Sequence, residues 1–526
     1  MPLSTEDLAA LAEIGISDRE AARQLALLDR PPGPLRLLRP CTVGDGILRL
    51  TAEEASSCAR RAQQELDSGT IIQFLPASGA ASRMFGTLIA ALQEEPSPPW
   101  RTLEARAWKG DEVSRGVLRL MADLERLPFA DPLARELGES EGELKTLLRR
   151  GRWRTILRAL LDPAGLGYAE LPKGLIPFHV QDGRARTALA EQLATGAELA
   201  AGSPRGHGFH VTVAPGWQED FQAEAARAAR GDGTAYRVTV SAQEPATGTL
   251  ALTADGRLVR DAAGHPLTRP GGHGALLANL ERCESAIVLL RNIDNVLPRG
   301  SWRSAAVSCR RVLLGLLLTV RDELAAALDR LTMRPVDPQA VAEVRALLEH
   351  RFGAGALPPP GDELTVEQEL LVDRLDRPLR VCGMVPSSGD PGGGPFWVAA
   401  DDGKESLQIV EAAQIATTDA EQDAIWHRST HFNPVDLACA IADSRGRRYD
   451  LSRFIDPDAV IVSEKRVGTV TARVLERPGL WNGAMARWNT LFVEIPRHTF
   501  APVKTVFDLL RPEHRGVDDP SRSESP

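Results

Sequence analysis

The alternation of strands and helices along the chain constrains its fold more than any other feature. An apolar run at 71–75 leads through small residues into a helix-like segment at 85–92. Further on, a strand-like segment at 208–213, a helix-like one at 218–230 and a strand-like one at 236–240 follow one another. Because parallel strands need a crossover between them, this order predicts an α/β fold with a mostly parallel sheet and helices on both faces.

Composition narrows the class of protein. The chain has 526 residues, 43% of them hydrophobic, which suits roughly two to four structural units. Its net charge of -9 argues against a nucleic-acid partner. The six cysteines form no C-x-x-C pair, so neither a zinc site nor a disulfide framework is predicted. The N-terminus shows no signal pattern, and the apolar run at 312–320 is too short to span a bilayer. We expect a cytoplasmic protein with no membrane partner.

A loop of small residues follows the apolar run at 71–75. Such a loop lets an anion approach the backbone N–H groups that a helix start leaves unpaired, and Arg83 adds a positive charge. The loop has neither the Walker pattern nor G-x-G-x-x-G. It is predicted either to bind a polyphosphate or to form a close-packed turn. The candidate anion-binding residues are Ala77, Ser78, Gly79 and Ala80.

Two further charged residues are candidates for phosphate chemistry. Lys173 lies between a proline and a glycine, where it is a fixed charge for phosphate or an ordinary surface lysine. Asp294 follows a strand-like segment at 285–293. A carboxylate at the carboxyl end of a buried strand can hold Mg²⁺ against substrate phosphates, although Asp-Asn is also a common turn.

Two glycine-rich loops are candidates for binding uncharged parts of a ligand. The segment 269–275 holds Gly271, Gly272 and His273, and its glycines permit close approach of a nucleobase. His273 is either an acid/base or a structural histidine. The loop at 390–395, within a β-rich section, either closes over a sugar or forms a wide turn. Segments 430–434 and 481–483 offer hydrogen-bonding and stacking groups of the kind that sugars use.

The order of these motifs resembles the UDP-sugar pyrophosphorylase family. In this chain the motifs are, in order, the small-residue loop with Arg83, Pro-Lys-Gly at 172–174, Gln243, Pro-Gly-Gly-His-Gly at 270–274, Asn-Ile-Asp-Asn at 292–295 and the segment 493–510. More closely, the chain is identified as a member of the domain of unknown function 4301 family. We interpret that family as a distant branch of the UDP-sugar pyrophosphorylase superfamily. The family's Gly-Gly-x-Gly-Thr-Arg loop is replaced here by a loop with the single glycine Gly79.

The resemblance implies a nucleotidyltransferase fold of the GT-A-like, doubly wound type. It also implies a reaction between an NTP, here UTP, and a sugar-1-phosphate. It implies catalytic roles for Arg83, Lys173 and Lys504, and a Mg²⁺ ligand in Asp294. The implied nucleotide-binding residues outside the small-residue loop are Gln243, Gly271, Gly272 and His273. The implied substrate-binding residues are Asn292, Gly393, Glu411, His431, Asn433 and Lys504.

Three functions remain open: a sugar-1-phosphate nucleotidyltransferase, a nucleotide-sugar-using glycosyltransferase or binding protein on the same fold, and a catalytically silent scaffold. No Asp-x-Asp triplet stands at the sheet-end positions, which favours the first. The expected division of the chain is a helical segment at 1–70, a nucleotide-binding core at 71–300 with a helical insertion at about 96–165, helices and a linker at 301–360, a β-rich substrate section at 361–512, and a disordered tail at 513–526.

Overall fold

A ten-stranded sheet forms the centre of the protein in the computed structural model, which describes residues 3–138, 144, 146–148, 150–203, 206–333, 335, 337–361, 363–387, 389, 392–400, 404–467 and 470–516. The strands, in order across the sheet, are β2 (Thr42–Val43), β3 (Gly46–Leu48), β18 (Asn489–Glu494), β11 (Leu379–Pro386), β15 (Asp436–Ala440), β10 (Ile287–Arg291), β4 (Ile72–Pro76), β7 (Gly208–Val213) and β8 (Arg237–Ala242), with β14 (His431–Phe432) beside β11.

The sheet is mixed but mostly parallel. Strand β15 runs antiparallel to both of its neighbours, β10 and β11. Strands β10, β4, β7 and β8 are parallel to one another, and so are β11, β18, β3 and β2. The α/β class and the mostly parallel sheet are therefore confirmed. Because β4, β7, β8 and β10 are parallel, the segments that follow them lie at one edge of the sheet.

Both faces of the sheet are buried, as the apolar strands predict. In β10, Ile287 and Leu289 face a core shared with the helices α3 (Ala52–Ser68) and α13 (Ser301–Thr332), which pack on each other. Val288 and Leu290 face a second core, formed with the short helix α12 (Leu277–Glu281) and with residues of β11 and β15. The pleat of the strand sends alternate side chains into these two cores.

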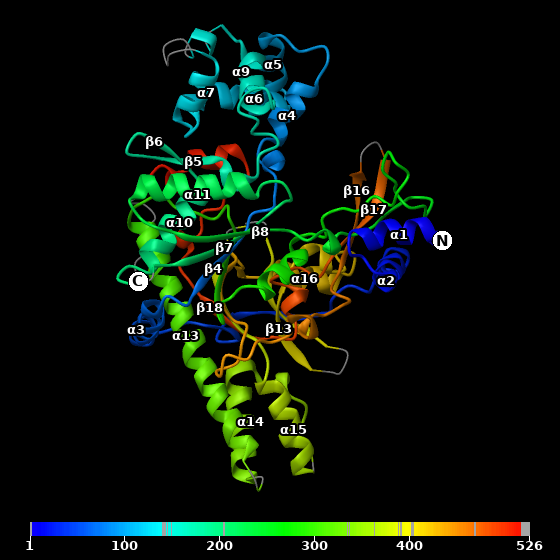
Figure 1. Cartoon of the computed structure of the whole chain (residues 1–526), viewed down its shortest axis with the longest axis vertical. Coiled ribbons are helices and arrows are strands. Elements are labelled where there is room, and N and C mark those ends of the chain that lie inside the picture. The colour runs from blue at the N-terminus through cyan, green and yellow to red at the C-terminus, as the bar shows by residue number, and fades with distance from the viewer. Residues whose placement is uncertain are drawn as a thin grey trace.

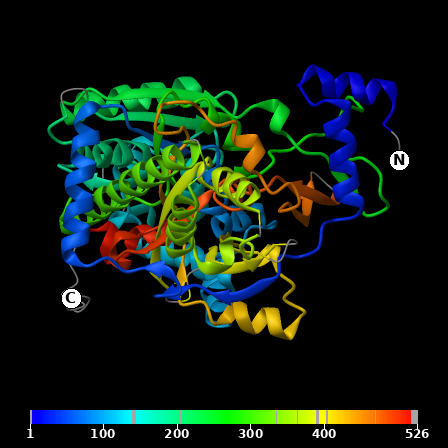
Figure 2. The ribbon, with the colours of Figure 1, turned by 90° about the horizontal axis from the view of Figure 1, so that it is seen from below.

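Three smaller sheets surround the central one. They are the three-stranded sheet of β1 (Leu37–Pro40), β12 (Gly394–Ala399) and β13 (Glu405–Val410), the three-stranded sheet of β16 (Ile461–Val467), β17 (Val470–Glu476) and β9 (Ala251–Thr253), and the pair β5 (Pro177–Gln181) and β6 (Arg184–Thr187). The N-terminal helices α1 (Thr5–Glu13) and α2 (Asp18–Asp29) lie beside β17, at one side of the molecule (Figure 2).

Helices extend the molecule along its long axis (Figure 1). At one end lie α5 (Trp100–Trp108), α6 (Glu112–Asp123), α7 (Ala130–Glu136) and α9 (Trp153–Leu161), and at the other α14 (Pro338–Phe352) and α15 (Leu364–Leu375). The remaining α-helices are α4 (Gly86–Gln93), α10 (Ala188–Leu199), α11 (Gln218–Asp232) and α16 (Ala420–His427). No helix of the described residues is both long and apolar enough to cross a membrane.

Two predicted boundaries need correction. The segment 1–70, predicted to be helical, also contains β1, β2 and β3, because β3 completes the parallel array next to β18 and β1 pairs with β12. The predicted disordered tail begins too early. His514 ends a short 3₁₀ helix, is buried, and lies 2.9 Å from His179 through its Nδ1 atom. The part of the predicted tail from 517 onward lies outside the described residues.

Candidate active site

The side chains of Lys173, Asp294 and Lys504 meet at the carboxyl edge of the sheet. Both lysine Nζ atoms donate to the same oxygen, Asp294 Oδ2, over 2.9 Å from Lys173 and 3.0 Å from Lys504. Lys173 Nζ also donates to the carbonyl oxygen of Val503 at 2.9 Å. Asp294 lies three residues beyond β10, at the position where ligands bind in open α/β sheets. Residues predicted from three distant segments are therefore in direct contact.

These three groups carry one negative and two positive charges in a largely buried place. The side chains of Asp294 and Lys173 are 10% and 14% exposed, whereas that of Lys504 is 49% exposed. Burial alone would raise the pKa of Asp294, but the charges of Lys504 and Lys173 lower it below its ordinary value. Burial lowers the pKa of Lys173, and Asp294 counteracts part of that effect. The site therefore has one positive charge in excess beside a carboxylate that stays ionised.

The small-residue loop lies directly beside Lys173. The Ala81 N–H donates to Leu171 O at 2.9 Å, and the Lys173 N–H donates to Gly79 O at 3.1 Å. A Cβ atom added at Gly79 would meet nothing within 4 Å, so the loop is open on its outer side. Within the described chain, no acceptor faces the backbone N–H groups of Ser78, Gly79 and Ala80. Three consecutive free amides next to a lysine are suited to bind an anion.

Arg83 lies at the end of the same loop, in a short 3₁₀ helix at Ala81–Arg83, and its side chain is exposed. Its charge is near enough to Lys173 to contribute to the lowering of that lysine's pKa. Ala77, at the start of the loop, is buried, and its N–H donates to Thr212 O at 2.8 Å. Ala77 thus fixes the loop to β7, while Arg83 is free to reach a ligand.

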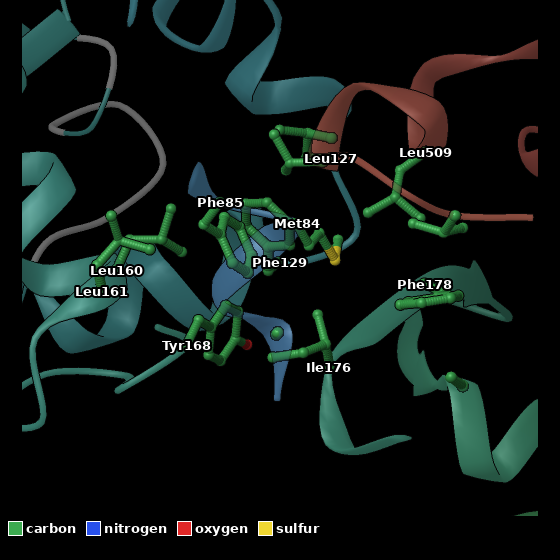
Figure 3. Packing of buried hydrophobic residues seen from close by; sticks show 14 of the residues in the cluster. Met84, Phe85, Leu127, Phe129, Leu160, Leu161, Tyr168, Ile176, Phe178 and Leu509 are labelled. Carbon is green, nitrogen blue, oxygen red and sulfur yellow. The ribbon is translucent and has the colours of Figure 1, made fainter. Parts of the chain in front are cut away.

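One hydrophobic cluster holds these segments together. It includes Met84 and Phe85 after the loop, Ile176 after Lys173, and Leu509 after Lys504. Figure 3 shows Met84 and Phe85 packed beside Phe129. Val503, which accepts the bond from Lys173, belongs to the same cluster, and its N–H donates to Asp294 O at 3.0 Å. The convergence of the three charged residues therefore rests on a shared apolar core.

Lys504 is held by an element that the sequence analysis did not assign. Asp508 Oδ2 accepts the N–H of Lys504 at 2.9 Å and that of Thr505 at 2.6 Å, and the Thr505 and Asp508 side chains form a capping box. Asp508 is buried and fixes the backbone that carries Lys504. The Thr-x-x-Asp spacing at 505–508 is the signal that identifies such a box in a sequence.

The glycines of the second loop pack against their own chain. A Cβ at Gly271 would lie 2.7 Å from Thr247 O, and one at Gly274 would lie 2.1 Å from Pro478 O. Gly272 has a φ of 73°, which favours glycine, and its Cβ would lie 2.9 Å from the Glu476 carboxylate. Close packing of the loop on Thr247 and on residues 477–478 accounts for Gly271 and Gly274 without a ligand.

His273 is fixed within this loop by three contacts. Its ring stacks on that of Trp481 with 3.9 Å between centroids. Its Nδ1 accepts the N–H of Leu480 at 2.8 Å, which places the proton of the neutral ring on Nε2. His273 Nε2 lies 3.5 Å from Glu411 Oε1. The imidazole is therefore oriented toward Glu411. The sequence did not reveal this partner, because it lies 138 residues away in the chain.

Glu411 joins His273 to two other predicted residues. The hydrogen bond with His273 lowers the pKa of Glu411, against the opposing effect of burial. Asn482 Nδ2 also donates to Glu411 Oε1, at 3.0 Å. A Cβ at Gly393 would lie 3.4 Å from Glu411 Cγ, and Gly393 O accepts the N–H of Asn433 at 2.8 Å. Of these predicted residues, Glu411 therefore contacts His273 directly, while Gly393 lies beside Glu411 and Asn433 is bonded to Gly393.

Three other predicted residues have different surroundings. His431 is buried, with Nε2 3.3 Å from Glu494 Oε1. Asn292 is half-buried, and its carbonyl oxygen accepts a bond from Gln192 at 2.8 Å. Gln243 follows β8 directly, is buried, and donates its N–H to Val213 O at 2.8 Å. Asn292 and Gln243 therefore lie at the same sheet edge as Asp294, because each follows a parallel strand of the central sheet.

Asp294, the predicted metal ligand, has one carboxylate oxygen engaged and one open among the described residues. Asp294 Oδ2 is occupied by two ammonium groups, while Oδ1 has no hydrogen-bond partner among the described residues. No group of three or more His, Cys, Asp and Glu side chains in that part of the chain is placed to hold a metal. Mg²⁺ is usually held by one or two carboxylates together with phosphate oxygens and water, so Asp294 Oδ1 suits a single direct ligand.

Comparison with known proteins gives a family and distant structural neighbours. The structure is similar to UDP-N-acetylglucosamine pyrophosphorylase from Trypanosoma brucei, with a TM-score of 0.47, 13% identity, and coverage of 97% of this chain and 79% of that one. A mutant UDP-glucose pyrophosphorylase from Leishmania major matches with a TM-score of 0.42, the same identity and the same coverage. No curated protein matches the sequence. The expected membership of the domain of unknown function 4301 family is confirmed: the chain belongs to the family described as Domain of unknown function (DUF4301), whose model matches residues 4–515.

Proposed function

We propose that this protein is a sugar-1-phosphate nucleotidyltransferase, which makes a nucleotide-sugar from an NTP and releases pyrophosphate. The observation that carries the proposal is the convergence of Lys173 and Lys504 on Asp294 Oδ2, beside a loop with three free amides. Two ammonium groups share one carboxylate, so a positive charge remains for a bound anion. The substrates of this reaction are polyanions that need such neutralisation.

The proposed chemistry requires no side-chain nucleophile. A phosphate oxygen of the sugar-1-phosphate attacks the α-phosphorus of the NTP, a new P–O bond forms, and the bond from the α-phosphorus to the bridging oxygen breaks. Pyrophosphate leaves with the electron pair of that bond. The protein must align the two reactants and neutralise charge. We assign Arg83, Lys173 and the loop amides to the triphosphate, and Lys504 to the sugar phosphate.

Mg²⁺ is part of this proposal. When bound, it would neutralise phosphate charge, and Asp294 Oδ1 is the oxygen that would hold it. Asp294 also orients the two lysines through Oδ2, whether or not a metal is present. Lys173 and Lys504 are thereby held close to each other despite their like charges. Arg83 differs from both lysines, because its side chain is exposed and has no ion-pair partner among the described residues.

The neutral parts of the substrates are assigned to the other predicted residues. Gln243 and Gly272, with the loop that carries His273, are proposed to bind the nucleobase, and uracil is the base that we expect. Gly393, Glu411 and Asn433 are proposed to bind the sugar. Glu411 is ionised and already accepts bonds from two neighbours. A sugar hydroxyl could donate to its remaining lone pairs.

A second candidate is a binding protein of the same fold that holds nucleotide-sugars without turnover. The observation that favours it is that both lysines are already paired with Asp294. In that case, the contacts among Lys173, Asp294 and Lys504 would mainly hold the 501–506 segment against the end of β10. A nucleotide would then bind through the loop amides and Arg83, and the lysines would contribute little.

A substrate screen separates these functions. Pyrophosphate release is measured with each common NTP, a panel of sugar-1-phosphates, and Mg²⁺, in the wild type and in Lys504→Ala. Turnover with one pair of substrates, reduced in the variant, supports the transferase. Nucleotide-induced thermal stabilisation without turnover supports the binding protein. Absence of both turnover and stabilisation across the panel contradicts both.

A further inference from the structure

A cavity with several arginines in its lining lies beside the glycine loop that carries His273. It has a volume of about 530 Å³, and its lining includes Gly274 and Ala275. Four arginines from four separate segments also line it: Arg23, Arg453, Arg477 and Arg487. Among the described residues, the lining excludes Lys173, Asp294 and Lys504, so this cavity is distinct from the candidate active site.

Two of the arginines are fixed in position. Arg477 Nε donates to Thr247 O at 2.8 Å, and its guanidinium lies 2.9 Å from Glu20 Oε1. Arg23 donates to Pro457 O at 3.0 Å and lies 3.5 Å from the same glutamate, Glu20. One carboxylate is therefore shared by two guanidinium groups, and the pair keeps an excess positive charge beside the cavity.

The other two arginines have no such partner. In the described part of the chain, no carboxylate or carbonyl accepts a bond from the side chain of Arg453 or of Arg487, and both side chains are exposed. One acidic residue, Glu281, lines the cavity, and its Oε1 accepts the N–H of Leu451 at 2.8 Å. The lining therefore holds four arginines and one acidic residue, Glu281, and among the described residues only Arg23 and Arg477 are paired with a further carboxylate, that of Glu20.

Apart from Thr247 and Ser452, the rest of the lining is apolar. It consists mainly of Ala275, Leu277, Ala278, Ile455, Pro478 and Ala484. Ligand sites of this size commonly combine an apolar wall with a few charged groups that fix one end of the ligand. Guanidinium groups bind phosphate through paired N–H donors, and they do so more strongly than uncharged donors.

We infer that this cavity is a binding site for a small phosphate monoester with an apolar body. The phosphate lies between Arg453 and Arg487, the two arginines without partners. The apolar body packs on the wall that includes Leu277 and Ile455. The site does not depend on the proposed transferase reaction, because its residues and ligand are separate from those at Asp294.

Isothermal titration with phenyl phosphate tests the inference. Inorganic phosphate, phenol and citrate are compared under the same conditions. We expect phenyl phosphate to bind the wild type more tightly than inorganic phosphate does, and phenol to give no measurable binding. The double variant Arg453→Ala/Arg487→Ala should weaken phenyl phosphate binding at least about tenfold, as expected for the loss of charge-assisted bonds. Citrate binding as tight as that of phenyl phosphate would overturn the assignment to phosphate.

Two controls make the result specific. Arg30→Ala/Arg445→Ala removes two exposed arginines outside the lining, with side chains 93% and 76% exposed, and should leave the Kd unchanged. Lys173→Ala should also leave it unchanged, because that residue belongs to the other site. Loss of phenyl phosphate binding in Lys173→Ala, with retention in the arginine double variant, would place the ligand at the candidate active site and overturn the inference. Absence of binding to the wild type would overturn it as well.

Discussion

Lys173 donates to Asp294 Oδ2 over 2.9 Å, although 121 residues separate the two in the chain. Both side chains are largely buried, so each must find compensation for its lost hydration. Lys504 adds a second bond to the same oxygen. A single buried ion pair would be electrically neutral, but this trio has a surplus positive charge at the open edge of the sheet. The proposed function assigns that surplus to the binding of an anionic substrate.

The two lysines are expected to respond differently to substitution. Lys504 is half-exposed, so Lys504→Ala should lower kcat by ~10²-fold, the usual effect of losing one preorganised charge, with little change in Tm. Lys173→Ala should also reduce activity, and it should destabilise the fold by about 1–3 kcal/mol, because Asp294 and Val503 O lose a buried donor. Steady-state kinetics and thermal unfolding measure both effects. Lys109→Ala, at an exposed lysine, is the control. Full activity in Lys504→Ala would contradict the assignment to the sugar phosphate.

The open loop at Gly79 allows a test by charge alone. A Cβ atom added at this position meets nothing within 4 Å, and the φ of Gly79 lies outside the left-handed region, so Gly79→Ala should fold with an unchanged Tm. Gly79→Glu should fold equally well but repel an anionic ligand from the loop amides. We expect nucleotide binding to weaken at least about tenfold, in line with the cost of a nearby like charge.

The matched control is Gly231→Glu, where an added Cβ also meets nothing within 4 Å. It should leave nucleotide affinity and Tm as they are in the wild type. Titration of nucleotide, followed by calorimetry, compares the three variants. Equal affinity in Gly79→Glu and Gly231→Glu would show that the small-residue loop is only a turn.

Asp294→Asn keeps the shape of the side chain and removes its charge. The two lysines then lose their shared counter-ion, and the proposed metal loses its carboxylate ligand. We expect a folded protein with most activity lost at saturating substrate, and partial recovery at high Mg²⁺ or with Mn²⁺, since a weakened site fills by mass action. Activity is measured across a metal titration. If the variant unfolds while its soluble fraction keeps full activity, Asp294 is structural and any metal is held elsewhere.

Strand order explains which of the candidate site residues could be predicted to lie together. Ala77–Arg83 follow β4 and Asp294 follows β10, and parallel strands bring such segments to one edge. Periodicity could not place Lys504, because its segment is an irregular stretch positioned by the Asp508 capping box and by apolar packing. The resemblance to a family supplied that residue instead.

Other features depended on contacts that no local pattern encodes. Strand β15 enters the sheet antiparallel between β10 and β11, an order that the sequence does not reveal. The glycines at 271 and 274 predict a loop that is open to a ligand. In the structure their close contacts are with residues 247 and 478 of the same chain. A glycine permits close approach of any backbone, so the pattern alone could not tell a ligand from the protein itself.

Two buried histidines, His207 and His514, should make the free energy of unfolding depend on pH. Burial, aided by the charge of Arg237, lowers the pKa of His207 to about 4, and burial together with His179 and Arg511 lowers that of His514 well below its ordinary value. His207 is therefore neutral in the folded protein at pH 5, and the pKa of His514 is shifted in the same direction, whereas in the unfolded chain both titrate near 6.5. The unfolded state binds more protons below that pH, so the free energy of unfolding falls as the pH decreases from about 6.5.

The shift at His207 alone corresponds to a loss of up to about 3 kcal/mol between pH 6.5 and 4. Denaturant unfolding at a series of pH values measures the slope. His207→Gln cannot take up the proton, so it should make the free energy of unfolding less dependent on pH over this range, whatever its effect on stability at pH 7. His427→Gln, at a histidine whose side chain is 70% exposed, should keep the wild-type slope. A slope in His207→Gln as steep as in the wild type would show that the acid sensitivity arises from other groups.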